Sequence, residues 1–244
     1  MNYNYNEISK IYDAVREADL KAVKFMIEKA QLSKESRVLE IGCGTANYLK
    51  IIYDITKPEV WGLDRSKGML SRAREKCKDA VLVEGDAIEL LEIPDSAFDL
   101  VYMVDVIHHI KDIEKMFKNI KRVLKENGKL VVFSDDHEHI RNRLTTKYFP
   151  ETLEGELRRY QDTPEIKDAL LRNYYNEIDN GILEIGEDLD YGSRLIEIAS
   201  KKGYSMFGMI SEGAIEAGIE RIKSDMLKHP VVYKQRAPYV IAVK

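Results

Sequence analysis

The sequence predicts an α/β fold, in which a doubly wound, mostly parallel sheet carries helices on both faces. Short apolar runs alternate with helical patterns through the first 134 residues, which is typical of parallel strands joined by crossover helices. The first three runs are each followed by glycine or aspartate, residues that favour turns. With 244 residues, 44% of them hydrophobic, the chain is long enough to bury a full core.

The first 134 residues contain the elements from which this fold is inferred. Apolar residues recur at helical spacing over residues 7–30, which predicts a first helix. Five strands are expected next, at residues 38–41, 60–63, 80–83, 98–104 and 129–133. Helices are expected between them, at residues 46–53, 67–77 and 112–124. Ser66 can cap the second of these helices, and Asn127 with Gly128 stops the third.

After residue 134 this alternation ends. Residues 135–180 are strongly charged, with interleaved aromatic residues, and are expected to be mostly helical. A strand is expected at 181–185, a helix at 191–202, a helix capped by Ser211 that runs to about 228, and a last strand at 239–243. The sequence contains no obvious flexible linker, so we expect one domain over residues 1–244.

Composition and charge narrow the class of protein. The net charge of −4 does not favour a nucleic-acid partner. Two cysteines make no disulfide framework and suit a reducing compartment. The first ten residues lack the apolar core of a signal peptide, and no apolar run approaches the roughly 20 residues of a membrane span. We therefore expect a cytoplasmic protein without a membrane span.

Three successive strands end in residues that suit a bound nucleoside. The first is followed by Gly42 and Gly44, which let the backbone turn sharply and approach a ligand. Asp64 ends the second, where a carboxylate can accept hydrogen bonds from ribose hydroxyls, and Asp86 follows the third, where it can accept one from an exocyclic amine. Ligands of doubly wound sheets bind beyond these strand ends. Each feature alone is a common turn, but together they predict a nucleoside site.

These motifs resemble the class I S-adenosylmethionine (SAM)-dependent methyltransferases. The chain is most similar to the type 11 domains of the small-molecule branch, which includes the ubiquinone-biosynthesis methyltransferases. The motifs that carry the resemblance are the stretches 38–45, 62–66, 69–70, 85–87, 98–101, 106–109, 124–125 and 128–130. They cover residues 8–134 well and the last strand loosely.

The resemblance implies a fold and a division of the chain. The fold is a Rossmann-like sheet of seven strands with an antiparallel last strand. Residues 1–30 would form a helical lid and 31–134 the cofactor-binding core. Residues 135–180 would form a helical cap insertion after the fifth strand, and 181–244 would complete the sheet.

The resemblance also implies a SAM site, with S-adenosylhomocysteine (SAH) as the product. The glycine turn would pass against the methionine part of SAM, with Glu40 orienting it, and Asp64 would hold the ribose. Asp86 and the backbone N–H of Ala87 would read the adenine edge. The full set expected at the cofactor is Tyr12, Glu40, Gly42, Cys43, Gly44, Asn47, Asp64, Arg65, Met69, Gly85, Asp86, Ala87, Val104 and His109.

Two neighbouring residues after the glycine turn bear on the family pattern and on its main rival. Many members have a third glycine where this chain has Ala46, which adds a methyl group near the start of the following helix. A dinucleotide-binding oxidoreductase would need a last glycine where Asn47 stands. The chain after residue 134 also shows no further strand–helix rounds, so we do not favour that reading.

Methyl transfer from SAM is an in-line displacement, which depends mainly on proximity and orientation. A base is needed only where the acceptor must lose a proton. The candidates are His108, His109 and Asp105, which follow the fourth strand. Either histidine can instead simply line the pocket. If one of them is the base, we expect His108 to serve the acceptor and His109 to line the cofactor pocket.

The acceptor is expected to be a small molecule bound between the lid and the cap insertion. The residues expected to contact it are Tyr12, Arg16, Arg141 and Tyr148. An inward-facing Arg141, Arg143 or Arg158 would bind a carboxylate or phosphate, although most cap charges are expected on a solvated surface. The alternatives are a tRNA or protein acceptor, or a regulatory SAM-binding subunit without turnover. We expect an enzyme without a metal site, acting as a monomer or homodimer.

Overall fold

The computed structural model describes residues 18–244. The two lid residues expected at the ligands, Tyr12 and Arg16, lie outside the described residues, as does the first part of the helix expected at 7–30. Within the described part, Asp19 caps the helix Leu20–Ala30 by accepting the N–H groups of Lys21 and Ala22. Residues 18 and 19 are not helical, so a single helix over 7–30 is wrong.

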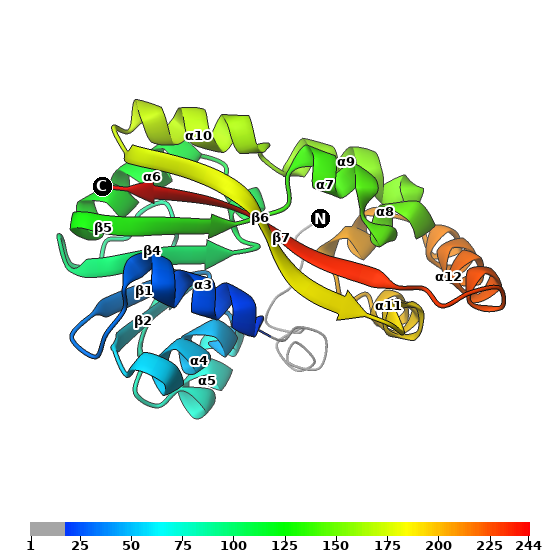
Figure 1. The fold of residues 1–244 in the computed structure, drawn as a ribbon, viewed down its shortest axis with the longest axis horizontal. Coiled ribbons are helices and arrows are strands. Elements are labelled where there is room, and N and C mark those ends of the chain that lie inside the picture. Colours follow the sequence, from blue (N-terminus) through cyan, green and yellow to red (C-terminus); the bar gives the residue numbers. More distant parts are fainter. Residues whose placement is uncertain (1–17) are drawn as a thin grey trace.

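Within residues 18–244, seven strands form one sheet in the order β3-β2-β1-β4-β5-β7-β6 (Figure 1). All neighbours are parallel except β7, which runs antiparallel to β5 and β6. This confirms the predicted fold class, including the antiparallel last strand. The strands are β1 Arg37–Ile41, β2 Glu59–Asp64, β3 Val81–Glu84, β4 Phe98–Val104, β5 Leu124–Phe133, β6 Asn176–Asp188 and β7 Tyr233–Val243.

Helices cover both faces of the sheet, with α3, α4 and α5 on one face and α6 and α10 on the other (Figure 1). The first group is α3 Leu20–Ala30, α4 Asn47–Thr56 and α5 Lys67–Lys76. The second group is α6 Ile113–Val123 and α10 Thr163–Arg172. The expected caps are confirmed, because Ser66 accepts the N–H of Met69 and Ser211 accepts that of Ala214.

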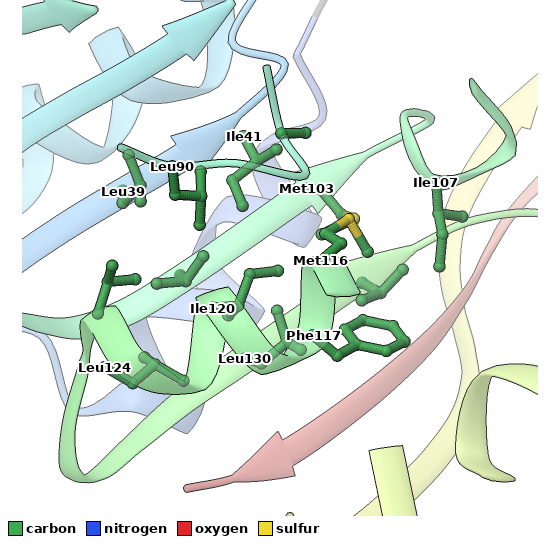
Figure 2. Packing of buried hydrophobic residues seen from close by; sticks show 14 of the residues in the cluster. Leu39, Ile41, Leu90, Met103, Ile107, Met116, Phe117, Ile120, Leu124 and Leu130 are labelled. Carbon is green, nitrogen blue, oxygen red and sulfur yellow. The ribbon is translucent and has the colours of Figure 1, made fainter. Parts of the chain in front are cut away.

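Side chains on the two faces of each central strand belong to two separate hydrophobic clusters. Leu100 and Tyr102 of β4 point to the side of α3 and α4, whereas Val101 and Met103 point to the side of α6. Figure 2 shows the α6 side, where Met116, Phe117 and Ile120 meet the sheet. Phe117 is completely buried, and burying a side chain of this size stabilises the fold by about 1.5–3 kcal/mol.

The remaining helices form a cap beyond the carboxyl ends of the parallel strands (Figure 1). Its helices are α7 His137–Asn142, α8 Leu144–Tyr148, α9 Leu153–Arg159, α11 Tyr191–Ser200 and α12 Glu212–Met226. Short 3-10 turns lie at η1 Ile107–His109, η2 Pro150–Thr152 and η3 Ser205–Met209. The cap has a hydrophobic cluster of its own, in which Phe149 packs edge-on against Phe207.

The boundaries expected for the cap insertion therefore need correction. The boundary at residue 180 falls inside β6, because that strand runs from Asn176 to Asp188. Helix α10 packs on the sheet through Ile166 and Leu170 rather than in the cap. In its place α11 and α12, which lie between β6 and β7, complete the cap. Among the described residues, no helix has both the length and the apolar character to cross a membrane.

Strands β6 and β7 form a long antiparallel ribbon that joins the sheet to the cap (Figure 1). Their pairing runs from Asn176 opposite Val243 to Asp188 opposite Tyr233, with shifts in register between Asn176 and Asp179 and between Glu184 and Gly186. Only the C-terminal part of β7 pairs with β5. The far end of the ribbon thus lies outside the central sheet and forms one wall of the space below the cap.

Candidate functional site

The glycine turn after β1 packs against the loop after β4. Gly42 has a φ of +69°, and its N–H donates to the carbonyl of Leu63 at 2.7 Å. A Cβ atom on Gly42 would lie 2.4 Å from Cγ2 of Val106, so only glycine fits. Ala46 also adopts a left-handed conformation, with φ +64°. Its methyl group is fully buried at the start of α4.

Asp64 connects the glycine turn to the loop after β2. Its Oδ2 accepts the N–H of Gly44 at 2.9 Å, and its Oδ1 accepts the N–H of Ser66 at 2.8 Å. Each carboxylate oxygen has a further lone pair for a ribose hydroxyl. Burial raises the pKa of Asp64, and the N–H donors oppose that shift.

Glu40 lies beneath the turn as a buried carboxyl group. It is 3% exposed and accepts a hydrogen bond from the hydroxyl group of Tyr102, with 3.0 Å between the two oxygens. Burial raises the pKa of Glu40 well above its usual value, and the Tyr102 hydrogen bond opposes that rise. This pair holds β1 and β4 together at the floor of the expected cofactor site.

The residues expected around adenine gather at the ends of β2 and β3. Asp86 accepts the N–H of Ile88 at 2.7 Å, and its Oδ2 lies 3.7 Å from Nε of the exposed Arg65. Gly85 donates its N–H to the carbonyl of Asp64 at 3.1 Å, which links the two strand ends. Ala87 and Met69 are buried beside them.

A lysine that the sequence did not single out supports the glycine turn. Lys76, in the last turn of α5, donates to the hydroxyl of Thr45 at 3.1 Å and to the side-chain oxygen of Asn47. Asn47 thus orients the start of α4 through Lys76. Cys43 is buried behind the turn, and a Cβ on Gly62 would lie 2.7 Å from its Sγ. No sequence signal pointed to Lys76, because its partners lie about 30 residues earlier, in the turn before α4 and at the start of that helix.

The three candidate bases follow β4 but face different surroundings. Asp105 has a φ of +54°, and its N–H donates to the carbonyl of Phe133 at 3.0 Å. His108 is 8% exposed, and its ring stacks on Tyr160 with 4.1 Å between the centroids. His109 is exposed, with its ring 4.0 Å from that of His108.

A cavity of about 330 Å³ separates the carboxyl ends of β4 and β5 from the cap. Tyrosine is the most frequent residue in its wall: Tyr48, Tyr160, Tyr191, Tyr204 and Tyr233. Val104 and Asp105 line it from the sheet. His108 and His109 do not line it, so His108 lies behind the ring of Tyr160. The position of Asp105 makes it the base candidate in direct contact with the cavity.

The two cap residues expected to contact the acceptor do not line this cavity. Arg141 is exposed, and Tyr148 is buried in the cap cluster, with its hydroxyl donating to Asp225 at 3.1 Å. Neither lines the cavity, whereas Arg143 and Arg159 do. Arg158, the third candidate, is exposed and pairs with Glu154. Neighbouring arginines on short helices look alike in sequence, so no signal separated them.

The two cavity arginines belong to a buried ion cluster. Arg143 donates to Asp135 at 2.7 Å and to Glu156, and Arg159 donates to the other oxygen of Glu156. Arg159 also donates to the hydroxyl of Ser205 at 2.9 Å. Burial raises the pKa of Asp135, and Arg143 opposes that rise. Within residues 18–244, no three His, Cys, Asp or Glu side chains are grouped so as to hold a metal ion.

Comparison with known proteins shows which family the core is similar to. Residues 39–132 match the family described as a methyltransferase domain, which confirms the resemblance inferred from the motifs. The demethylmenaquinone methyltransferase of Listeria welshimeri is 30% identical over 148 residues, which cover 56% of this chain and 62% of that protein. This chain thus spans less than two thirds of the length of such curated relatives.

Two solved structures share the fold. A candidate methyltransferase from an antibiotic biosynthesis pathway of Anabaena variabilis superposes with a TM-score of 0.77 at 22% identity, covering 92% of this chain and 98% of that one. Phosphoethanolamine N-methyltransferase 2 of Haemonchus contortus, in complex with phosphomonomethylethanolamine and SAH, gives 0.65 at 20% identity. That alignment covers 99% of this chain and 58% of that one.

Proposed function

Because residues 39–132 match the methyltransferase domain family, we propose that this protein is an enzyme that transfers the methyl group of SAM to a small molecule held in the cavity. The nucleophile of the acceptor forms a bond to the methyl carbon while the carbon–sulfur bond breaks. The sulfur keeps that electron pair, and SAH leaves.

The proposed SAM site follows the ends of β1, β2 and β3. Asp64 is held by backbone N–H groups with lone pairs left for ribose hydroxyls. Asp86 stands at the end of the next strand, where the adenine edge would lie. Gly42 packs closely on Val106, so the turn carries no side chain at this position. The backbone of the turn is therefore proposed to contact SAM directly.

The observation that carries the proposal is the shared boundary of the cavity and this cofactor site. Tyr48 is the second residue of α4, the helix that follows the glycine turn. Val104 ends β4, the strand next to β1, and Asp105 follows it; all three residues line the cavity. A methyl group at these strand ends would face the cavity. Proximity and orientation of this kind contribute up to about 7–11 kcal/mol to such reactions.

Asp105 is the proposed base for acceptors that must lose a proton. Burial raises the pKa values of Tyr48, Tyr160 and Tyr233, and the charge of Asp105 adds to each rise. These tyrosines therefore stay protonated and donate hydrogen bonds, whereas the carboxylate can accept a proton. His108 is proposed to position Tyr160, on which its ring is stacked.

The relatives support a small acceptor over a macromolecule. The Listeria relative is named for demethylmenaquinone, and the Haemonchus structure holds phosphomonomethylethanolamine. The cavity of about 330 Å³ has the size of a small-molecule site. A tRNA or protein acceptor would need an extended surface, and no observation favours one.

Thermal unfolding with added SAM, SAH and NAD tests the cofactor. A ligand present at about 100 times its dissociation constant adds roughly 2.7 kcal/mol to the folded state. We expect a raised midpoint with SAM and SAH and none with NAD. No shift with either sulfur compound would contradict the proposal, and binding of SAH without release of labelled product from any acceptor would favour the regulatory subunit.

We further propose a cytoplasmic protein that acts as a monomer or homodimer. Cys43 and Cys77 are free and buried, which suits a reducing compartment. Light scattering after size exclusion would give the mass of the particle, to be compared with 28.2 kDa for one chain.

A further inference from the structure

The charged residues of the cavity wall are unevenly distributed. Asp19, Asp105 and Asp135 lie at the strand ends, where Asp135 is paired with Arg143, and Arg236 lines the cavity from β7. The charged residues of the cap wall are Arg143, Arg159 and Arg194, with Glu156 as its one acid among the described residues. A positive sulfonium at the strand ends would lie beside the aspartates. An acceptor that fills the cavity therefore meets the arginines of the cap wall with its far end.

Glu156 fixes both arginines in place. Its two oxygens each accept from a different guanidinium, and its side chain is 2% exposed. The side chain of Arg143 is 10% exposed and that of Arg159 is 21% exposed. Each guanidinium has five N–H donors in a rigid plane, so a carboxylate shared between two arginines cannot accept from all of them. Some N–H groups therefore remain available to a ligand.

The leftover hydrogen-bonding groups lie in this wall. Among the described residues, five buried side-chain polar atoms have no hydrogen-bond partner. Three of them belong to residues that line the cavity: Nε of Arg143, Nε of Arg159 and Oγ1 of Thr145. Buried polar groups are nearly always paired, so three orphans in one wall call for a ligand that accepts hydrogen bonds. Guanidinium groups match the geometry of carboxylates and phosphates.

We propose that the methyl acceptor carries a carboxylate or phosphate group, and that Arg143, Arg159 and Thr145 bind it at the cap wall. This inference rests on the proposed methyl transfer. It assigns an orientation as well as a class: the anion lies under the cap, and the nucleophile points toward Asp105 and the strand ends. The tyrosines between the two ends would enclose the middle of the acceptor.

Arginine Nε–H resonances give the sharpest test. The full-length protein, labelled with ¹⁵N and saturated with SAH, is titrated separately with inorganic phosphate and with acetate, and the signals are assigned from Arg143→Lys and Arg159→Lys. We expect the Arg143 and Arg159 signals to shift in a saturable way, while that of the exposed Arg158 stays in place. A larger response to phosphate or to acetate identifies which oxyanion the acceptor carries.

Affinity for the same probes in two variants completes the test. Thr145→Val keeps the shape of the side chain and removes one orphan, and should weaken binding of the preferred probe by about tenfold. Arg158→Lys, one residue from Arg159, should bind like the wild type. Unmoved Arg143 and Arg159 signals, or equal affinities in all three proteins, would overturn the inference. Because SAH binding is measured first, its absence would instead count against the proposed function.

Discussion

Asp64 and Gly44 come from loops after different strands, yet the N–H of Gly44 donates to Oδ2 of Asp64 at 2.9 Å. The carboxylate that is proposed to hold the ribose therefore also sets the position of the glycine turn. Asp64→Ala should weaken SAH binding by roughly 10- to 100-fold, since hydrogen bonds to a charged group contribute about 1.5–3 kcal/mol. Calorimetric titration measures this, with Asp54→Ala on the exposed face of α4 as control. Equal affinities in the two variants would contradict the assignment.

Gly42 should not tolerate a side chain. Gly42→Ala combines a φ of +69° with a Cβ placed 2.4 Å from Cγ2 of Val106, and should lower the free energy of unfolding by about 1–3 kcal/mol or more. Guanidinium titration measures this. Gly213→Ala is the matched control, because a Cβ added at that position of α12 would have no atom within 4 Å, and alanine should stabilise that helix.

A second change tells the two causes of this loss apart. In Gly42→Ala with Val106→Ala, the nearest valine atom left would be Cβ, at 3.3 Å. Partial recovery of stability is expected, with the backbone strain as the part that remains. No recovery would mean that the close contact with Val106 contributes nothing.

Lys76 should matter for the cofactor although it lies outside every motif. Lys76→Met removes the donors to Thr45 and Asn47, and should weaken SAH binding by about fivefold to tenfold, the equivalent of one hydrogen bond. Lys67→Met, on the same helix with only an exposed partner in Glu84, should bind SAH like the wild type. An affinity equal to that control would show that the glycine turn does not need Lys76.

Glu40 should make stability depend on pH in a defined direction. Its folded pKa is raised by burial above the usual 4.5, so folding favours the protonated form. The stability that this provides is fully present below pH 4.5 and is lost as the pH rises toward the folded pKa. Glu40→Gln lacks this titration, so the free energy of unfolding of the wild type should fall relative to the variant as the pH rises. A constant difference between the two proteins would refute the raised pKa.

Asp105→Asn should slow the reaction more than His109→Asn. Of these two residues, only Asp105 lines the cavity, and loss of a general base typically costs about 10²- to 10⁴-fold in rate. The release of SAH at saturating SAM, with an acceptor found by screening carboxylates and phosphates, measures both variants. An Asp105→Asn enzyme with unchanged turnover would show that the acceptor needs no base there.

Much of the sheet and of the expected cofactor site could be predicted from the sequence because both depend on local signals. Buried parallel strands are short apolar runs, and the residues that turn the chain or cap a helix follow them directly. The expected strand at 98–104 agrees with β4 in both bounds. Gly42, Asp64 and Asp86 come together because parallel strands place their carboxyl ends on one edge of the sheet.

Only the tertiary structure decided which residues form the cavity. Arg141 and Arg143, like Arg158 and Arg159, lie on or beside short charged helices whose inner face no periodicity reveals, and only Arg143 and Arg159 point to the cavity. Tyr233 reaches the same wall through the β6–β7 ribbon, across about 90 positions of the chain. The motifs reflect the local geometry at the ends of single strands and could be found in the sequence. The residues that line the cavity depend on how helices far apart in the chain pack together, which no local pattern shows.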